Sequence, residues 1–198
     1  RLLASTVLRE LGRIDKGLAP FLKSPIERFD PAVAALLRVG AAQCWCLGTP
    51  AHAAVGETVA AARQEGATRR AAGLINAVLR RAARERRAFD AAPEHSVWPD
   101  WLVERLRGSL GDEGLARLAA AQRRMPELHL TARDPEAAAQ ALDARIMASG
   151  SLALPVGAVE GLAGYADGAW WVQDAAAALP ARLLDVSEGE PVVDLCAA

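Results

Sequence analysis

The chain has 198 residues, of which 52% are hydrophobic and 24% charged, a composition that excludes a disordered or fibrous protein. Its length allows one large domain or two small ones. Arginine interrupts every apolar stretch before it reaches the roughly 20 residues of a membrane span, so we expect no membrane segment. Cys44, Cys46 and Cys196 are spaced unlike zinc ligands, so we expect no metal, and their odd number fits a reducing cytoplasm.

The net charge of −1 is unevenly distributed along the chain. Between Arg63 and Arg87 there are eight arginines and two glutamates, a net charge of +6, which leaves −7 for the remaining residues. Clustered positive charge is typical of a surface that binds a polyanion, whereas mixed charge is typical of an ordinary solvated surface. This segment is therefore the first candidate for a binding site.

Up to about residue 124 the apolar residues recur at helical spacing, which predicts a compact helical bundle. Asp or Thr followed by Pro marks a helix start, because the side-chain oxygen accepts an unpaired backbone N–H and proline has none to satisfy. The first expected helix carries an apolar stripe from Ala4 to Leu11 and ends near Gly12. The second begins at Asp30 and Pro31, and the third begins at Thr49 and Pro50 and ends near Gly66. Three more are expected, over residues 68–87, over residues 101–110 with a stop at Gly111, and after a cap at Asp112.

Beyond Pro126 the pattern changes. Leu128, Leu130 and Ala132 alternate with polar residues at the strand period of two. After this strand we expect a helix from Asp134 to Gly150 that carries Ile146, a strand over 170–172, a helix over 174–184 and a buried strand over 192–195. The alternation of strands and helices predicts α/β packing.

The helix expected over residues 68–87 separates charge from core. Its apolar stripe centres near Val78, and six arginines lie on the opposite side, within an arc of about 120°: Arg69, Arg70, Arg80, Arg81, Arg84 and Arg87. As one rod this face would be about 27 Å long, comparable with several nucleotides. It is either a phosphate-binding ridge or a solvated helix surface, and the scarcity of acidic residues at i,i+4 favours the ridge.

The last residues form a second candidate. The expected strand over 192–195 leads into three small residues, Cys196, Ala197 and Ala198. Such a passage lets the backbone approach a ligand closely, as in nucleotide-binding α/β folds, and the alternative is a plain strand end.

Three segments, in this order along the chain, carry a resemblance to a known family. They are Pro50-Ala51-His52-Ala53-Ala54-Val55, Gly73-Leu74-Ile75-Asn76-Ala77-Val78-Leu79-Arg80-Arg81, and Trp171-Val172-Gln173-Asp174 followed by Asp194-Leu195-Cys196-Ala197-Ala198. The chain resembles the bacterial 16S ribosomal RNA cytosine-5 methyltransferases of the RsmB (Sun/Fmu) type over nearly its whole length.

The resemblance implies an α plus α/β fold in four parts. Residues 1–90 would form an all-helical NusB-like bundle that binds RNA, residues 91–126 a helical linker, residues 127–190 a small α/β subdomain, and residues 191–198 the first strand of a Rossmann-like methyltransferase domain. The implied partner is 16S ribosomal RNA, and the implied methyl donor is S-adenosylmethionine.

The resemblance also implies roles for individual residues. Cys196, Ala197 and Ala198 match the start of the family's methyl-donor loop, D-L-C-A-A-P-G-G-K-T, and are expected to contact S-adenosylmethionine. Both catalytic cysteines of the family are expected beyond Ala198, so Cys196 has no nucleophilic role and these 198 residues alone are expected to be inactive.

Two other classes of function stay open at this point. One is a non-enzymatic, NusB-like RNA-binding regulator of transcription, against which the α/β segment after Pro126 argues. The other is a helical interaction domain whose arginines are only solvated.

Overall fold

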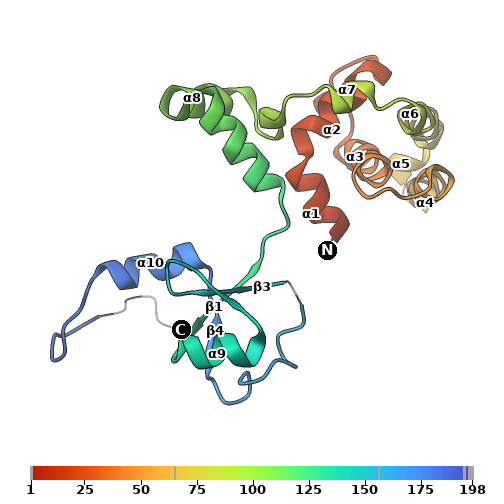
Figure 1. Cartoon of the computed structure of the whole chain (residues 1–198). Helices are drawn as coiled ribbons and strands as arrows, with labels where there is room; N and C mark the ends of the chain where they lie inside the picture. The colour runs from red at the N-terminus through yellow and green to blue at the C-terminus, as the bar shows by residue number, and fades with distance from the viewer. Residues whose placement is uncertain (1, 65, 156, 194, 196–198) are drawn as a thin grey trace. The chain divides into compact units, whose positions relative to one another are not determined.

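The computed structural model of the chain describes residues 2–64, 66–155, 157–193 and 195. The chain divides into two compact units, Arg1–Arg124 and Met125–Ala198. Figure 1 shows that the first unit is helical and that the second contains a small sheet.

The first unit packs its helices around one apolar core. Ile14, Leu18, Leu37, Ile75 and Leu79 have no solvent exposure in it. The α-helices are α1 (Leu2–Arg9), α2 (Leu11–Leu18), α3 (Pro31–Trp45), α4 (Ala51–Gln64), α5 (Gly66–Arg69), α6 (Ala72–Arg84), α7 (Arg87–Asp90) and α8 (Asp100–Arg123), with 3-10 turns η1 (Ala19–Phe21), η2 (Ile26–Arg28) and η3 (Glu94–Val97) between them.

The helix starts predicted at Asp30-Pro31 and at Thr49-Pro50 and the predicted break at Gly111 are confirmed. Asp30 Oδ1 accepts a hydrogen bond from the Ala32 N–H at 2.9 Å and so caps α3. Gly111, with φ 66° and ψ 177°, interrupts α8. Both signals are local, because a cap and a left-handed glycine each depend on only a few neighbouring residues.

The prediction that a helix ends near Gly12 is wrong. Gly12 lies inside α2, which continues to Leu18. A Cβ at this position would collide with the backbone carbonyl oxygen of Ser96 in η3. This glycine therefore permits close packing between two segments and does not stop a helix.

The prediction of one helix over residues 68–87 is also wrong. The chain forms α5, turns, forms α6 and then leaves the helical conformation at Glu85, with φ −136° and ψ 110°. The turn allows α6 to reverse direction and pack beside α4. Within this connection the hydroxyl of the buried residue Thr68 donates a hydrogen bond to the carbonyl of Ala62 at 2.8 Å. After Glu85 the chain brings Phe89 onto Trp45, with ring centroids 5.1 Å apart.

The second unit is a four-stranded antiparallel sheet with two helices. Its strands, β1 (Leu128–Ala132), β2 (Arg145–Ile146), β3 (Leu152–Leu154) and β4 (Trp170–Val172), have the order β2-β3-β1-β4. Leu130 lies opposite Leu152 on one side and Val172 on the other. The helices are α9 (Pro135–Leu142) and α10 (Ala175–Leu183), each capped by an aspartate.

The strands over 128–132 and 170–172 are confirmed, whereas the helix expected to run to Gly150 is wrong beyond Leu142. Asp143 takes a left-handed conformation, φ 50°, and ends α9, and Ile146 lies in β2. Strands β2 and β3 were not predicted, because Arg145-Ile146 is too short to show alternation and Leu152–Leu154 is apolar throughout. The resulting sheet is wholly antiparallel, which corrects the expected α/β packing to a small antiparallel sheet with helices.

The buried strand expected over 192–195 does not form in the described residues. Val192, Val193 and Leu195 are 60%, 78% and 90% exposed and lie outside any strand. A buried parallel strand needs neighbouring strands and helices on both faces, and the described residues supply none at this position. Among the described residues, no helix has the length and apolar character needed to cross a membrane.

Candidate nucleic-acid interface

Helix α6 presents arginines on the side opposite its buried stripe. Ile75, Leu79 and Ala82 are fully buried against the core. Arg80, Arg81 and Arg84 fall on the opposite face and are exposed, as the spacing of the helix requires. The placement of these three arginines on one face is confirmed, and their binding to phosphate stays a prediction.

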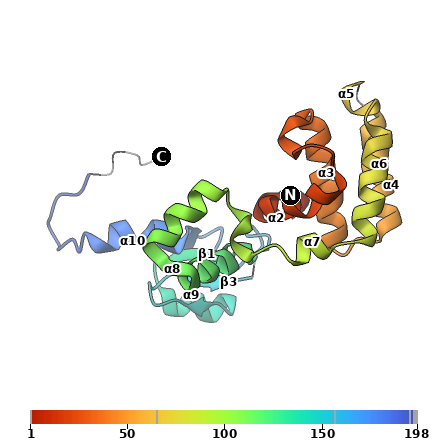
Figure 2. The same ribbon diagram turned by 90° about the horizontal axis from the view of Figure 1, so that it is seen from above.

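The other three predicted arginines flank α6 instead of extending it. Arg69 lies in α5, Arg70 in the turn that follows, and Arg87 in α7. Figure 2 shows α5 at one end of α6 and α7 near the other. The single 27 Å rod is therefore replaced by a helix of 13 residues, about 20 Å long, with arginines at both ends. We call these six residues the basic face.

Neutral contacts orient three of the guanidinium groups. Arg80 Nε donates to Asn76 Oδ1 at 3.1 Å, and Arg69 Nε donates to the carbonyl of Arg63 at 2.9 Å. Arg81 Cζ lies 5.1 Å from the centre of the Phe21 ring. These contacts position the groups without neutralising their charge.

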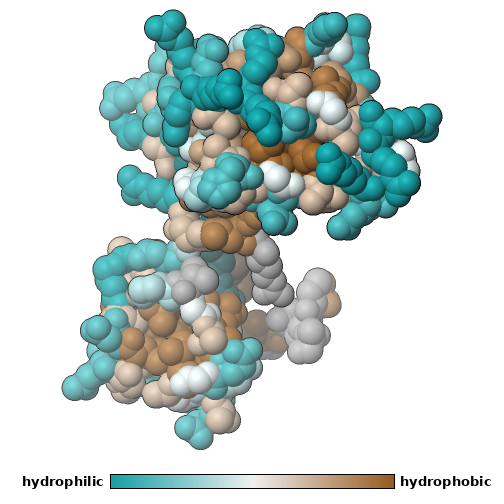
Figure 3. Space-filling view, turned by 90° about the vertical axis from the view of Figure 1, so that its right-hand side faces the viewer, coloured by the Kyte–Doolittle hydropathy of each residue, from teal (hydrophilic) through white to brown (hydrophobic). Residues whose placement is uncertain are grey.

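All six side chains of the basic face belong to exposed residues, and within the described part of the chain none forms an ion pair with a carboxylate. Figure 3, which views the molecule from the side of α4 and α6, shows hydrophilic side chains projecting from the helical unit around a smaller apolar area. Exposed guanidinium groups without carboxylate partners remain available for phosphate oxygens, which they meet in bidentate geometry.

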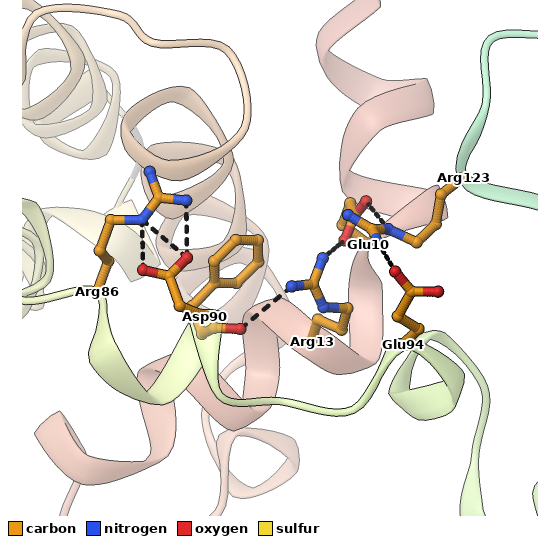
Figure 4. Close-up of polar contacts among 7 residues, drawn as sticks. Glu10, Arg13, Arg86, Asp90, Glu94 and Arg123 are labelled. Carbon is orange, nitrogen blue, oxygen red and sulfur yellow. Dashed lines mark hydrogen bonds and ion pairs between the residues drawn. The ribbon is translucent and has the colours of Figure 1, made fainter. Parts of the chain in front are cut away.

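Other arginines of this unit serve the fold. In Figure 4, Glu10 accepts from Arg13 Nη1 at 2.8 Å and from Arg123 Nε at 2.7 Å, and Arg123 also contacts Glu94 at 3.2 Å. Because Glu10 and Arg13 are only 8% and 7% exposed, this network is internal. It joins α2 and η3 to the end of α8.

Arg86 differs from the six arginines of the basic face in that a described carboxylate, Asp90, binds it. Its guanidinium binds Asp90 at 2.9 Å, and this hydrogen bond raises the pKa of Arg86 above its ordinary value (Figure 4). Arg86 is not one of the six arginines predicted for the ridge, and its ion pair with Asp90 sets it apart from them.

The two described cysteines are half-buried thiols. Burial raises the pKa of both, that of Cys46 to about 11. A thiol with such a pKa is a poor nucleophile and metal ligand at neutral pH. No group of three or more His, Cys, Asp or Glu side chains that could hold a metal ion occurs in the described part of the chain.

The predicted contacts to S-adenosylmethionine cannot be placed, because Cys196, Ala197 and Ala198 lie outside the described residues. Sequence reasoning missed Phe21 and the Glu10 network. Arg123 is 113 positions from Glu10, and no local pattern indicates a pairing at that separation.

Comparison with known proteins supports the family resemblance. The NusB family model matches residues 1–84. Ribosomal RNA small subunit methyltransferase B of Xanthomonas campestris pv. campestris is 36% identical over 97% of this chain and 46% of its own length. The protein of the same name from Pseudomonas putida is 36% identical over 94% of this chain and 46% of its own length.

A solved structure shares the fold. The crystal structure of PH0851 matches with a TM-score of 0.69 and 16% identity over 96% of this chain and 47% of that chain. The chain spans about half the length of the curated relatives it matches. Residues 1–84 thus match the NusB family, and the chain over nearly its whole length is similar to ribosomal RNA small subunit methyltransferase B.

Proposed function

We propose that residues 1–124 bind RNA through the basic face. The observation that carries this proposal is the set of six exposed arginines that no described carboxylate neutralises. Phosphate contacts of this kind supply most of the sequence-independent affinity of a protein for nucleic acid. The match of residues 1–84 to the NusB family and the names of the relatives support RNA as the polyanion.

We further infer that the protein acts in a ribosomal RNA methyltransferase reaction. In this reading the chain recruits 16S ribosomal RNA, and the methyl group passes from S-adenosylmethionine to C5 of a cytosine, a reaction that takes place in the cytoplasm. Cys196, Ala197 and Ala198 would begin the loop that holds the methyl donor. This description follows the family resemblance and the relatives' names, and its chemistry involves residues beyond the described ones.

The similarity to the relatives favours this function over a NusB-like regulator. The NusB match ends at residue 84, whereas the similarity to the methyltransferases covers 97% of the chain. The sequence similarity to the methyltransferases therefore extends over the sheet unit as well as the helical unit.

The test is charge reversal on α6. We expect Arg80→Glu with Arg84→Glu to weaken binding to a 16S ribosomal RNA transcript at least about tenfold and to reduce the slope of log K against log salt by about 1 to 2, because two phosphate contacts are lost. A filter-binding titration at several salt concentrations measures both quantities.

The matched control reverses the same charge elsewhere in the unit. Arg105→Glu with Arg117→Glu changes two exposed arginines of α8 and is expected to leave the slope unchanged. Equal losses of affinity in both double variants would mean that RNA responds only to net charge, which would contradict the proposal.

A further inference from the structure

The helical unit contains an open groove beside α2 that is separate from the basic face. The groove has a volume of about 790 Å³ and lies wholly within the first unit. Its lining comes from three parts of the chain: α2, the segment from η1 to η2, and the segment from η3 to the start of α8. Ligand-binding sites have volumes of about 300 to 1,000 Å³, so this groove is large enough for a planar organic group.

The junction of α2 with η3 forms part of the groove lining. Gly12 allows these two segments to touch, because a Cβ on it would collide with the backbone carbonyl oxygen of Ser96. Lys16 Nζ donates a hydrogen bond to Ser96 Oγ at 2.9 Å across the same junction. Trp98 and Pro99 follow η3 directly and belong to the lining as well. The groove is therefore formed by segments that already contact one another.

The lining of the groove is mainly apolar and includes an aromatic ring. Leu11, Leu22, Ile26 and Val97 supply aliphatic side chains, and Trp98 supplies an indole ring. Trp98 is half-buried, so it keeps surface that a ligand can cover. A planar ligand stacks favourably on such a ring.

The charged residues of the groove are of both signs. Lys16 and Lys23 line it, and they are the two lysines of the whole sequence. Glu27 and Asp100 line it too. Within the described part of the chain, none of these four side chains forms an ion pair. The groove thus offers free hydrogen-bond donors and free acceptors together.

This balance of charge favours a nucleobase over a phosphate as the ligand. The remaining carboxylate of the lining, that of Asp15, is neutralised by Arg38, which donates two hydrogen bonds to it at 2.8 Å. A site for phosphate needs an excess of positive charge, which the groove lacks. The edge of a base carries both donors and acceptors, and lysine and carboxylate side chains are among the groups that pair with them.

The groove adjoins the basic face through η1. Turn η1 contacts α6, and Arg81 Cζ of the basic face lies 5.1 Å from the centre of the Phe21 ring in η1. Leu22 and Lys23, the next two residues, line the groove. In Figures 1 and 2, α2, which leads into η1, lies between α8 and α6. Two residues span at most about 7 Å, so the groove begins close to the basic face.

We propose that the groove binds an unpaired base of the RNA whose phosphates the basic face holds. The inference rests on the proposed function, because it takes RNA as the ligand, and it adds that this RNA has unpaired nucleotides. The base stacks on Trp98, and its edge meets the lysines and carboxylates of the groove. Proteins recognise unpaired bases by this combination of stacking and hydrogen bonding, and a fully paired duplex offers no such base.

The first test compares a single-stranded RNA oligonucleotide with a fully paired duplex of the same sequence. Trp98→Leu is expected to weaken binding of the single strand at least about fivefold, because stacking is lost. The slope of log K against log salt should not change, because no phosphate contact is lost. The affinity for the duplex should also stay unchanged. Equal losses for the two RNAs, or no loss for the single strand, would overturn the inference.

Two variants control for the fold. Trp98→Phe keeps an aromatic ring and is expected to keep the affinity for the single strand within about twofold. Trp101→Leu removes a tryptophan that is 66% exposed and is not among the described residues that line the groove, and it should bind both RNAs as the unchanged chain does. A loss with Trp101→Leu equal to that with Trp98→Leu would contradict the assignment of the base to the groove.

The second test reads the groove through its two lysines. Sulfo-NHS-acetate acetylates exposed amines, and mass spectrometry resolves the rates at Lys16 and Lys23. With bound single-stranded RNA we expect both to react at least about threefold more slowly, and with bound duplex we expect them to react at the rates of the free chain. Unchanged rates with both RNAs would overturn the groove as a base site.

The same measurements separate this inference from the proposed function. Loss of RNA binding by Arg80→Glu with Arg84→Glu, without any protection of the lysines by RNA in the unchanged chain, would support the basic face and refute the groove. Protection of the lysines that persists in that double variant at unchanged affinity would refute the basic face and support the groove. A dimer of the chain in sedimentation velocity that Trp98→Leu dissociates would make a protein the occupant and overturn the inference.

Discussion

At the scale of single residues, the arginines fall into two groups. Some are paired with a buried carboxylate, and others are exposed without a described carboxylate partner. Arg13 and Arg123 share the buried carboxylate of Glu10, whereas Arg80 and Arg84 are exposed and have no described carboxylate partner. A buried charge must be paired to be tolerated, and an exposed one need not be. The first pair therefore serves stability, and the second is available for a ligand.

Glu10→Gln is expected to lower the free energy of unfolding by about 2 to 4 kcal/mol, because it leaves the buried Arg13 guanidinium without its counter-charge. Urea denaturation measures this change. Glu113→Gln is the control, since Glu113 forms an exposed pair with Arg117, with side chains 86% and 73% accessible, and should cost less than about 0.5 kcal/mol. Equal costs would show that the Glu10 network is not internal.

Cys46 is expected to react slowly with iodoacetamide in the folded protein. Its pKa of about 11 lies above the ordinary value of 9.0, so at pH 8 its thiolate fraction is roughly 10 to 100 times smaller than in the unfolded chain. The rate should rise as the pH increases toward 11. Peptide mass spectrometry with and without urea measures it, and equal rates in the two states would contradict the raised pKa.

At the scale of elements, local signals were predictable and tertiary ones were not. Asp30 and Gly111 act through their immediate neighbours, so the start of α3 and the break in α8 could be predicted from sequence. The turn between α5 and α6 exists because α6 packs against α4, and apolar periodicity does not report such a reversal. Arg80, Arg81 and Arg84 could be placed on one face in advance, because all three lie within α6. Arg69 and Arg87 could not, because they lie in α5 and α7, beyond the ends of that helix.

Two glycines should respond to alanine in opposite directions. Gly12→Ala is expected to destabilise the protein by about 1 to 3 kcal/mol, because the new methyl group would collide with the Ser96 backbone. Gly73→Ala is expected to stabilise it by up to about 1 kcal/mol, because Gly73 lies in α6, where a Cβ would meet no atom within 4 Å and alanine is the better helix former. Thermal unfolding compares them, and destabilisation by both would contradict the packing described here.

At the scale of the whole molecule, the two units carry different surfaces. The basic face of the helical unit carries charge without a described carboxylate partner, and the sheet unit exposes several large apolar side chains in its last part. The first surface suits a polyanion.

The most direct test of the basic face is arginine footprinting. Phenylglyoxal modifies exposed guanidinium groups, and mass spectrometry resolves the rate at each residue. With bound 16S ribosomal RNA we expect modification of Arg80, Arg81 and Arg84 to slow at least about fivefold, because phosphates occupy their donors, while Arg105 and Arg117 on α8 react as before. Protection of the α8 arginines, with those of α6 unaffected, would contradict the account.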